Sequence, residues 1–108
     1  MKVNLTPHVI KTTDGKEYPP SGAVARVESR HALYNIDGDG DEIFRVKYGT
    51  VTNLPPRKEG TTYIVSAMVL SALKGMREDV VAPATSHPDV KRDSKGQIET
   101  VPGFVIYD

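Results

Sequence analysis

The chain has 108 residues, 38% of them hydrophobic, and this length predicts one domain spanning residues 1–108. Fourteen basic residues balance fourteen acidic ones, so the basic excess that non-specific nucleic-acid binding requires is missing. The absence of cysteine excludes disulfides, thiolate zinc sites and cysteine nucleophiles. Neither a signal peptide nor an apolar run approaching the roughly 18 residues of a membrane span is present, so we expect a cytoplasmic protein without membrane association.

The first thirty residues predict short extended segments joined by turns. Apolar and polar residues alternate in residues 2–6, which is typical of a half-buried strand, and extended structure resumes in residues 8–12 after Pro7. Residues 13–16 (Thr-Asp-Gly-Lys) predict a turn, and residues 19–22 (Pro-Pro-Ser-Gly) a rigid loop. A further strand is expected over residues 23–30.

The middle of the chain predicts two strand-like runs around a polar, acidic loop at residues 35–42. The second run, residues 43–51, alternates apolar and basic side chains, and Gly49 suggests a bulge or bend. The acidic loop does not match a calcium-binding loop. Counted from Asp37, the sixth and twelfth positions hold Glu42 and Tyr48 where glycine and glutamate are required. We therefore expect a solvated hairpin tip.

Residues 61–83 contain the strongest core signal. Residues 61–65 are β-rich by type, Ser66 is suited to cap a helix, and residues 67–74 are helical by propensity and nearly all apolar, which predicts a buried helix. Gly75 is expected to end that helix in the left-handed conformation.

The remainder of the chain predicts three further features. Residues 80–83 predict a short buried strand, residues 93–96 a hairpin-like turn and residues 104–107 a last strand. Taken together, the elements predict an α+β, β-rich fold: a small curved sheet or open barrel packing one short helix over about residues 67–75.

Several residues are candidates for chemistry. His8, His31 and His87 share no short metal-ligating spacing, so no metal site and no cofactor is expected. The kink at Pro7 can aim His8 into a pocket. Ser66 stands where unpaired amides favour an anion, although a plain N-cap is the stronger interpretation. Arg77 can clamp a ligand or pair with Asp79, and pairing is again the stronger interpretation.

Three motifs occur in a distinctive order. They are Asn-Leu-Thr-Pro-His at residues 4–8, Pro-Pro-Ser-Gly leading into Val-Ala-Arg-Val at 19–27, and Tyr-Ile-Val-Ser-Ala with Arg-Glu-Asp-Val-Val and a proline at 63–83. This order resembles a family of small proteins encoded by tailed bacteriophages, prophages and some actinobacteria. Arg92, Asp93 and Gly96 resemble that family's Arg-Asp-x-x-Gly element, whereas residues 97–100 depart from its Gly-Cys segment. The resemblance implies a phage origin and the host cytoplasm, without an established activity.

The motif residues of that family define a candidate ligand-binding set: Asn4, His8, Ser21, Arg26, Ser66, Arg77 and Arg92. If they converge, they suit a small anionic, nucleotide-like ligand, with arginines on phosphate and His8 or Asn4 on base or ribose. The first hypothesis is thus a non-catalytic phage accessory protein that sequesters a host defence signal. The alternative is a protein–protein interaction module, either an inhibitor of a host enzyme or a minor virion component. A third is a phosphodiesterase or nuclease using His8. The low apolar content also suggests homo-oligomer formation.

Overall fold

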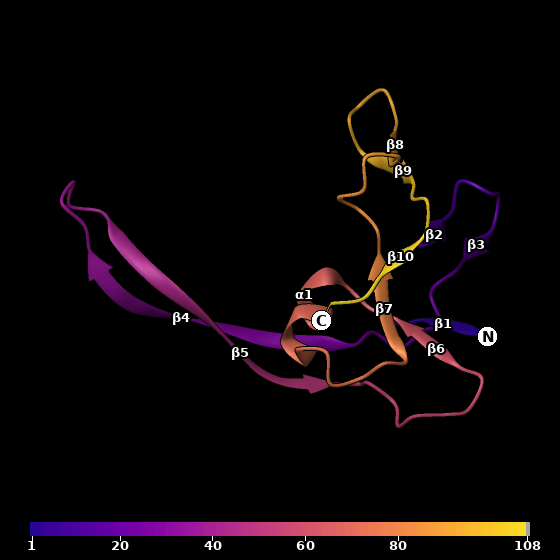
Figure 1. The fold of residues 1–108 in the computed structure, drawn as a ribbon, viewed down its shortest axis with the longest axis horizontal. Helices are drawn as coiled ribbons and strands as arrows, with labels where there is room; N and C mark the ends of the chain where they lie inside the picture. Colours follow the sequence, from indigo (N-terminus) through magenta and orange to yellow (C-terminus); the bar gives the residue numbers. More distant parts are fainter. Residues whose placement is uncertain (108) are drawn as a thin grey trace.

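A computed structural model describes residues 1–107, which form eight short strands, two long strands and one helix (Figure 1). In chain order these are β1 (Lys2–Asn4), β2 (Ile10–Lys11), β3 (Glu17–Tyr18), β4 (Arg26–Ile36), β5 (Glu42–Thr52), β6 (Thr62–Ile64), α1 (Ala67–Leu73), β7 (Val80–Pro83), β8 (Lys91–Arg92), β9 (Ile98–Thr100) and β10 (Phe104–Val105).

The largest sheet has the order β1-β6-β7-β10. Strand β6 runs parallel to both β1 and β7, and β10 runs antiparallel to β7. Three two-stranded sheets, β2-β3, β4-β5 and β8-β9, complete the fold. The predicted β-rich α+β class with one short helix is confirmed, in the form of small open sheets, and within residues 1–107 no sheet closes into a barrel.

Strand β6 lies at the centre of the core because both of its faces are buried. Tyr63 and Val65 face a cluster that includes Val69 of α1 and Val80 of β7. Ile64, between them in sequence, faces the opposite side and packs against Ile10 and Val101. Side chains alternate along a strand, so a run without polar residues can supply two clusters at once. This explains the continuous apolar sequence from Tyr63 to Val65.

Helix α1 begins as predicted and ends one residue earlier than predicted. The Ser66 hydroxyl accepts a hydrogen bond from the Val69 backbone N–H at 3.2 Å, which confirms the N-cap. Lys74, rather than Gly75, is the first left-handed residue, with φ of 53°. The prediction of a fully buried helix is wrong. The sheet covers only one side of α1, so Leu70 is buried whereas Met68 is 49% exposed. No helix within residues 1–107 has the length and apolar character needed to cross a membrane.

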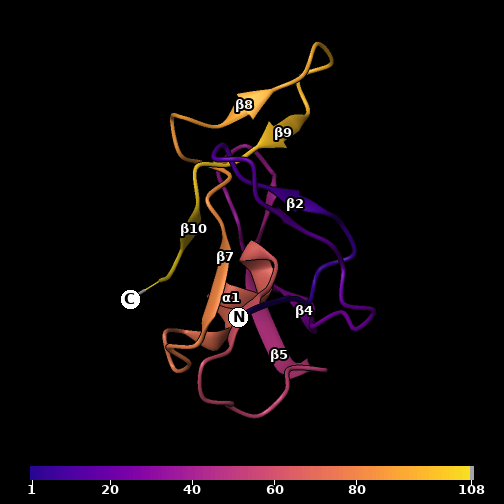
Figure 2. The same ribbon diagram turned by 90° about the vertical axis from the view of Figure 1, so that its right-hand side faces the viewer.

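The β4-β5 hairpin extends well away from the remaining strands, and we call it the arm (Figures 1 and 2). It lengthens the molecule: the radius of gyration is 16.3 Å, against about 13 Å for a compact chain of this length. Strand β4 begins three residues later than predicted and continues to Ile36, so the predicted loop over 35–42 shortens to a tight tip. The predicted irregularity at Gly49 is confirmed, because the pairing register shifts between Val27 and Ser29, opposite this glycine.

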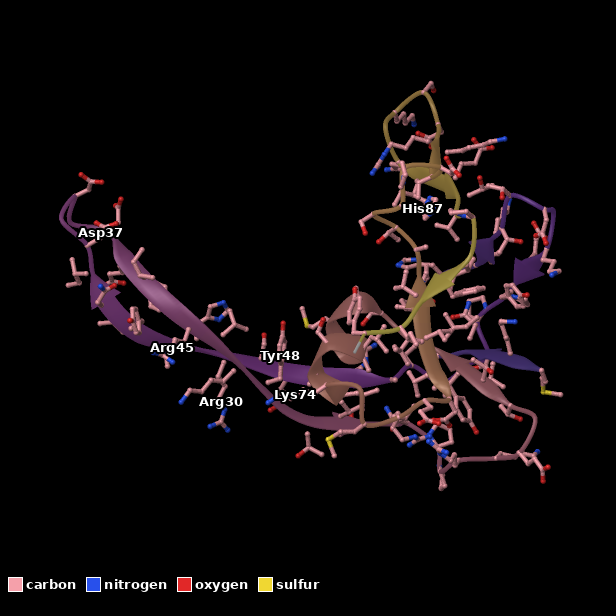
Figure 3. The ribbon with its side chains drawn as sticks, in the orientation of Figure 1. Arg30, Asp37, Arg45, Tyr48, Lys74 and His87 are labelled. Atoms are coloured by element: carbon pink, nitrogen blue, oxygen red, sulfur yellow. The ribbon has the colours of Figure 1, made fainter. Side chains whose placement is uncertain are left out.

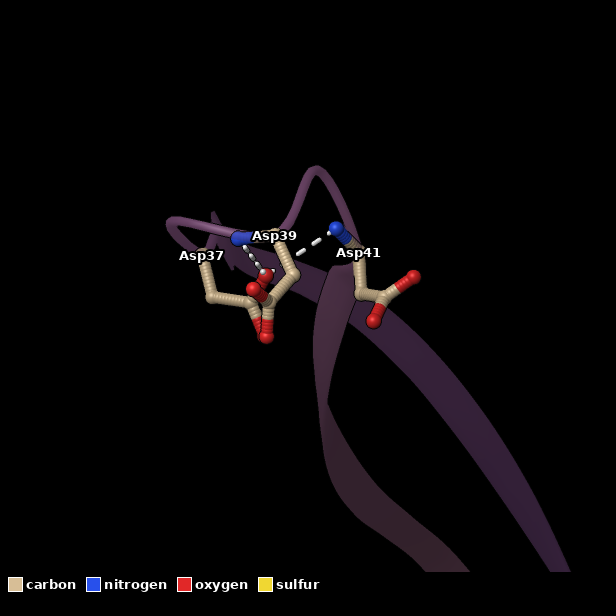
Figure 4. Close-up of side chains that lie close together, drawn as sticks. All are labelled: Asp37, Asp39 and Asp41. Carbon is tan, nitrogen blue, oxygen red and sulfur yellow. Dashed lines mark hydrogen bonds between the residues drawn. The ribbon is translucent and has the colours of Figure 1, made fainter.

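The acidic tip of the arm is a turn built on Asp37 (Figure 4). The Asp37 carboxylate accepts hydrogen bonds from the backbone N–H groups of Asp39 and Asp41, each at 3.0 Å. These bonds gather carboxylate oxygens of the three residues within 4.8 Å of one another. The expectation of a hairpin tip that uses Gly and Asp for turn geometry is confirmed.

Replacement of Leu70 by Ala tests the one-sided burial of α1. Leu70 is 3% exposed, so removing its side chain should leave a cavity and lower the free energy of unfolding by about 2–5 kcal/mol. The matched change Met68→Ala, in the same helix at an exposed position, should cost less than about 1 kcal/mol. Urea denaturation followed by circular dichroism measures both. Equal losses would contradict this packing.

Candidate functional site

Asn4 is a buried positioning residue whose side chain is fully hydrogen-bonded. Its Nδ2 donates to the backbone carbonyls of His8 and Tyr18 at 2.7 and 2.8 Å. Its Oδ1 accepts from the backbone N–H and the hydroxyl of Thr6 at 2.9 and 2.7 Å. An amide has two donors and one acceptor with two lone pairs, so this set is complete. Asn4 therefore fixes the loop from Thr6 to His8 and has no polar group left for a ligand.

A cleft of about 930 Å³ lies where the arm joins the body, and we call it the arm-root cleft. The loop fixed by Asn4, the inner part of the arm and the start of α1 form its walls. Its basic side chains are Arg26, Arg30 and Lys47, and Glu28 is its acidic one. Within residues 1–107, none of these three cations forms an ion pair with a carboxylate. The cleft therefore presents positive charge that internal partners do not neutralise.

The arm-root cleft also has an apolar surface. Leu5, Ala25 and Val69 belong to the main core cluster and form its buried floor. Tyr48 and Met68 line it while remaining 40% and 49% exposed. The cross-strand register places Arg30 and Lys47 on the opposite face of the arm from Tyr48, so these cations border the cleft and do not face this ring (Figure 3).

A second cleft, of about 550 Å³, adjoins the first and contains His8. The two clefts share Thr6, Pro7 and Ser66 as lining residues. The second one is mainly apolar, and its Lys11 pairs with Glu17 at 3.6 Å. Of the residues predicted from sequence, Arg26, Ser66 and His8 thus lie along one continuous surface, with Ser66 between the other two.

Arg77 lies elsewhere and acts as a structural residue. Its guanidinium donates two hydrogen bonds to the Asp79 carboxylate, both at 2.8 Å, and a third to the Pro55 carbonyl at 3.0 Å. The predicted pairing with Asp79 is confirmed. This bidentate contact holds the residues just before β7 against the segment that connects β5 to β6, which contains Pro55. Arg77 lines neither cleft.

Ser21 and Arg92 also lie outside both clefts. The Ser21 backbone N–H donates to the Asn4 carbonyl at 3.0 Å, which joins the Pro-Pro-Ser-Gly loop to β1. The Arg92 guanidinium donates to the Gly96 carbonyl at 2.8 Å and so closes the β8-β9 turn. The structure therefore does not bring the seven predicted residues together, and five of them have internal structural roles: Asn4, Ser21, Ser66, Arg77 and Arg92.

Sequence reasoning did not select Arg30, Lys47 or Tyr48. Arg30 pairs with Lys47 across the arm, and Tyr48 pairs with Ser29. The two basic residues of each strand, Arg26 and Arg30 in β4 and Arg45 and Lys47 in β5, lie an even number of positions apart, and this alternation was the available signal. The cross-strand register that aligns them depends on two bulges, one at Gly49 in β5 and one at Tyr34 in β4. Strand periodicity alone does not fix such a register.

The Arg77–Asp79 pair should make stability depend on pH in the acid range. Hydrogen bonds from Arg77 hold the pKa of the Asp79 carboxyl below its usual 3.8, so the stabilisation is present above about pH 4 and is lost as the pH falls below that value. Asp79→Asn should lower the free energy of unfolding by about 1–3 kcal/mol at pH 7. The loss in free energy of unfolding that Asp79→Asn causes should be smaller at about pH 3 than at pH 7.

Thermal unfolding at pH 7 and at about pH 3 measures this difference. Asp89→Asn is the control, because the Asp89 side chain is 78% exposed and should change stability little at either pH. An Asp79→Asn deficit that is the same at both pH values would contradict the assignment.

Comparison with known proteins adds no relative: no family model, no curated protein sequence and no solved structure matches this chain.

Proposed function

We propose that the chain is a non-catalytic binding protein whose arm-root cleft takes a small phosphorylated ligand of the nucleotide class. The observation that carries the proposal is the presence of three unpaired cations, Arg26, Arg30 and Lys47, on one face of the arm at the border of the cleft, whose lining also includes the half-exposed Tyr48 and Met68. In the phage family that the motifs resemble, such a protein would act in the infected host cytoplasm by sequestering a host signal.

The cations supply the affinity for phosphate. A guanidinium offers planar pairs of N–H donors that match phosphate oxygens, and a lysine adds a mobile point charge. Glu28 offsets one of the three positive charges, so the rim keeps a net positive charge. A phosphate or pyrophosphate group is therefore favoured over a neutral sugar or an apolar molecule.

The exposed apolar lining of the cleft supplies the affinity for a base. Tyr48 presents a half-exposed ring and Met68 a polarizable thioether, and both can pack against a flat heterocycle. The volume of about 930 Å³ lies within the range of roughly 300–1,000 Å³ that is usual for small-molecule sites. A ligand with a second base or ribose would extend past Pro7 and Ser66 towards His8.

Hydrolysis is less well supported than binding. Among residues 1–107, His8 has no ion pair with a carboxylate and its imidazole takes part in no hydrogen bond, so no side chain orients it as a base. A binding role requires no such partner. The protein–protein alternative is favoured by a separate observation, the exposed apolar side chains of the arm.

Arg26→Ala tests the ligand site. Calorimetric titration with AMP, ADP-ribose and cyclic dinucleotides should identify a ligand, and the variant should weaken its binding by about tenfold, or roughly 1.4 kcal/mol. Arg92→Ala is the matched control, since this exposed arginine closes the β8-β9 turn outside both clefts.

If ligand binding is unchanged in Arg26→Ala but lost in Arg92→Ala, the ligand-binding site does not lie at the arm root. If the intact chain releases no heat with any member of the panel, the proposal is wrong.

A further inference from the structure

The arm has two chemically different faces. Cross-strand partners lie on the same face of a hairpin, and successive residues of a strand alternate between faces. One set of side chains, which we call the apolar face, consists of His31, Leu33, Phe44, Val46 and Tyr48. The charged residues of the other set, which we call the basic face, are Arg26, Glu28, Arg30, Arg45 and Lys47. In Figure 3, Tyr48 projects to the upper, concave side of the arm, whereas Arg30 and Arg45 project to the lower side.

The basic face carries positive charge that the rest of the chain does not neutralise. Its four basic side chains stand against Glu28 alone, which leaves a net charge of +3. All four basic residues are exposed, and within residues 1–107 none of them forms an ion pair with a carboxylate. This face therefore attracts an anionic partner from solvent.

The neutral charge of the whole chain does not reveal this face, because acidic and basic residues of the arm are separated in space. The acidic residues that follow the basic face lie at the tip, from Asp37 to Glu42. The tip begins three residues beyond Arg45, which is roughly 10 Å along the strand and exceeds the screening length of about 8 Å at physiological salt. A partner that lies on the basic face is therefore attracted by its cations and is little repelled by the tip.

The cations of the basic face form a line along the arm. Arg26 and Arg30 are four residues apart in β4, Lys47 pairs with Arg30, and Arg45 pairs with Ala32. The line from Arg26 to Arg45 thus covers six residue steps, or roughly 20 Å. This length corresponds to about six nucleotides at the 3.4 Å rise of a stacked strand. A linear polyanion can contact all four cations, whereas one mononucleotide is too short to do so.

The outer end of the line provides a flat surface for stacking. The Arg45 guanidinium lies over the ring of Tyr34 at 4.4 Å, and Tyr34 is 56% exposed. Unpaired bases stack on aromatic rings and on guanidinium planes, and this stacking tolerates any base sequence. The bases inside a duplex are already stacked on one another. The pair of Tyr34 and Arg45 therefore favours a single strand over a duplex.

We infer that the basic face of the arm binds single-stranded nucleic acid. Arg26, Arg30, Lys47 and Arg45 contact its phosphates, and a base stacks on the surface formed by Tyr34 and Arg45. The inference goes beyond the proposed function, because Tyr34 and Arg45 line neither cleft. The strand and a nucleotide in the arm-root cleft share three cations and therefore compete.

The salt dependence of binding tests the phosphate contacts. Fluorescence anisotropy measures it with labelled oligothymidylate and oligouridylate of about 12 nucleotides, and at least one of the two should bind. Four phosphate contacts predict a slope of about −2.8 for the logarithm of the binding constant against the logarithm of salt concentration. Arg45→Ala should change this slope to about −2.1 and weaken binding about tenfold. Lys95→Ala is the control, since it removes an exposed cation of the β8-β9 turn and should change neither quantity.

The inference is wrong if neither oligonucleotide binds. Equal effects of Arg45→Ala and Lys95→Ala would overturn the placement of the strand on the basic face, and so would binding that Arg45→Ala does not alter. Unlabelled poly-glutamate is the test for an acidic protein as the partner. If it displaces the oligonucleotide as well as an unlabelled oligonucleotide does, the assignment to nucleic acid is wrong.

Tyr34→Ala tests the stacking contact. It should weaken binding about tenfold and leave the salt slope unchanged, because it removes a ring and no charge. Tyr34→Phe keeps the ring and should retain binding, and a duplex of the same length should bind at least about tenfold more weakly than the single strand. Equal binding of duplex and single strand would overturn the preference for unpaired bases. Circular dichroism confirms that each variant is folded, and if Tyr34→Ala unfolds the chain, the duplex comparison decides.

The two proposals fail independently. Arg45→Ala leaves the lining of the arm-root cleft intact, so titration of this variant with the nucleotide panel measures the cleft by itself. A chain that binds the oligonucleotide but no member of the panel would overturn only the proposed function. A chain that binds a nucleotide but no oligonucleotide would overturn only the inference about the basic face.

Discussion

The hydrogen bonds of the buried Asn4 side chain organise the surface on which both clefts lie. Asn4 is 2% exposed and contacts three segments: its own loop at Thr6, the following turn at His8 and β3 at Tyr18. Each of these bonds replaces a hydrogen bond to water, and an unpaired amide at this position would be costly. The Thr6–His8 loop is held against the body by these bonds and separates the two clefts.

The molecule combines a small, well-covered body with a long arm that lacks internal cover. In the body, β6 is buried on both faces, α1 covers one side of the sheet, and the Arg77–Asp79 pair fixes the entrance to β7. In the arm, cross-strand hydrogen bonds satisfy the backbone but leave the side chains of the apolar face in water. This contrast is the physical reason to look for a partner at the arm rather than at the body.

The arm-root cleft lies where body and arm meet, and its chemistry draws on both. The core provides the apolar floor, while the arm provides Arg26, Arg30 and Lys47. The register of the arm separates the two contributions, because Arg30 and Lys47 lie on the opposite face of the arm from Tyr48 (Figure 3).

The sequence by itself determined the local elements: the Ser66 cap, the strand from Val80 to Pro83, the turn at Gly96, the Arg77–Asp79 pair and the acidic hairpin tip. All of these depend on residues close in the chain, where cap, turn and alternation rules apply directly. Only the tertiary structure decided that Asn4 is enclosed by its own hydrogen bonds, that α1 is covered on one side, and that Arg30 and Lys47 join Arg26 at one cleft. These features depend on strand register and on contacts between distant segments, which residue type and periodicity alone do not specify.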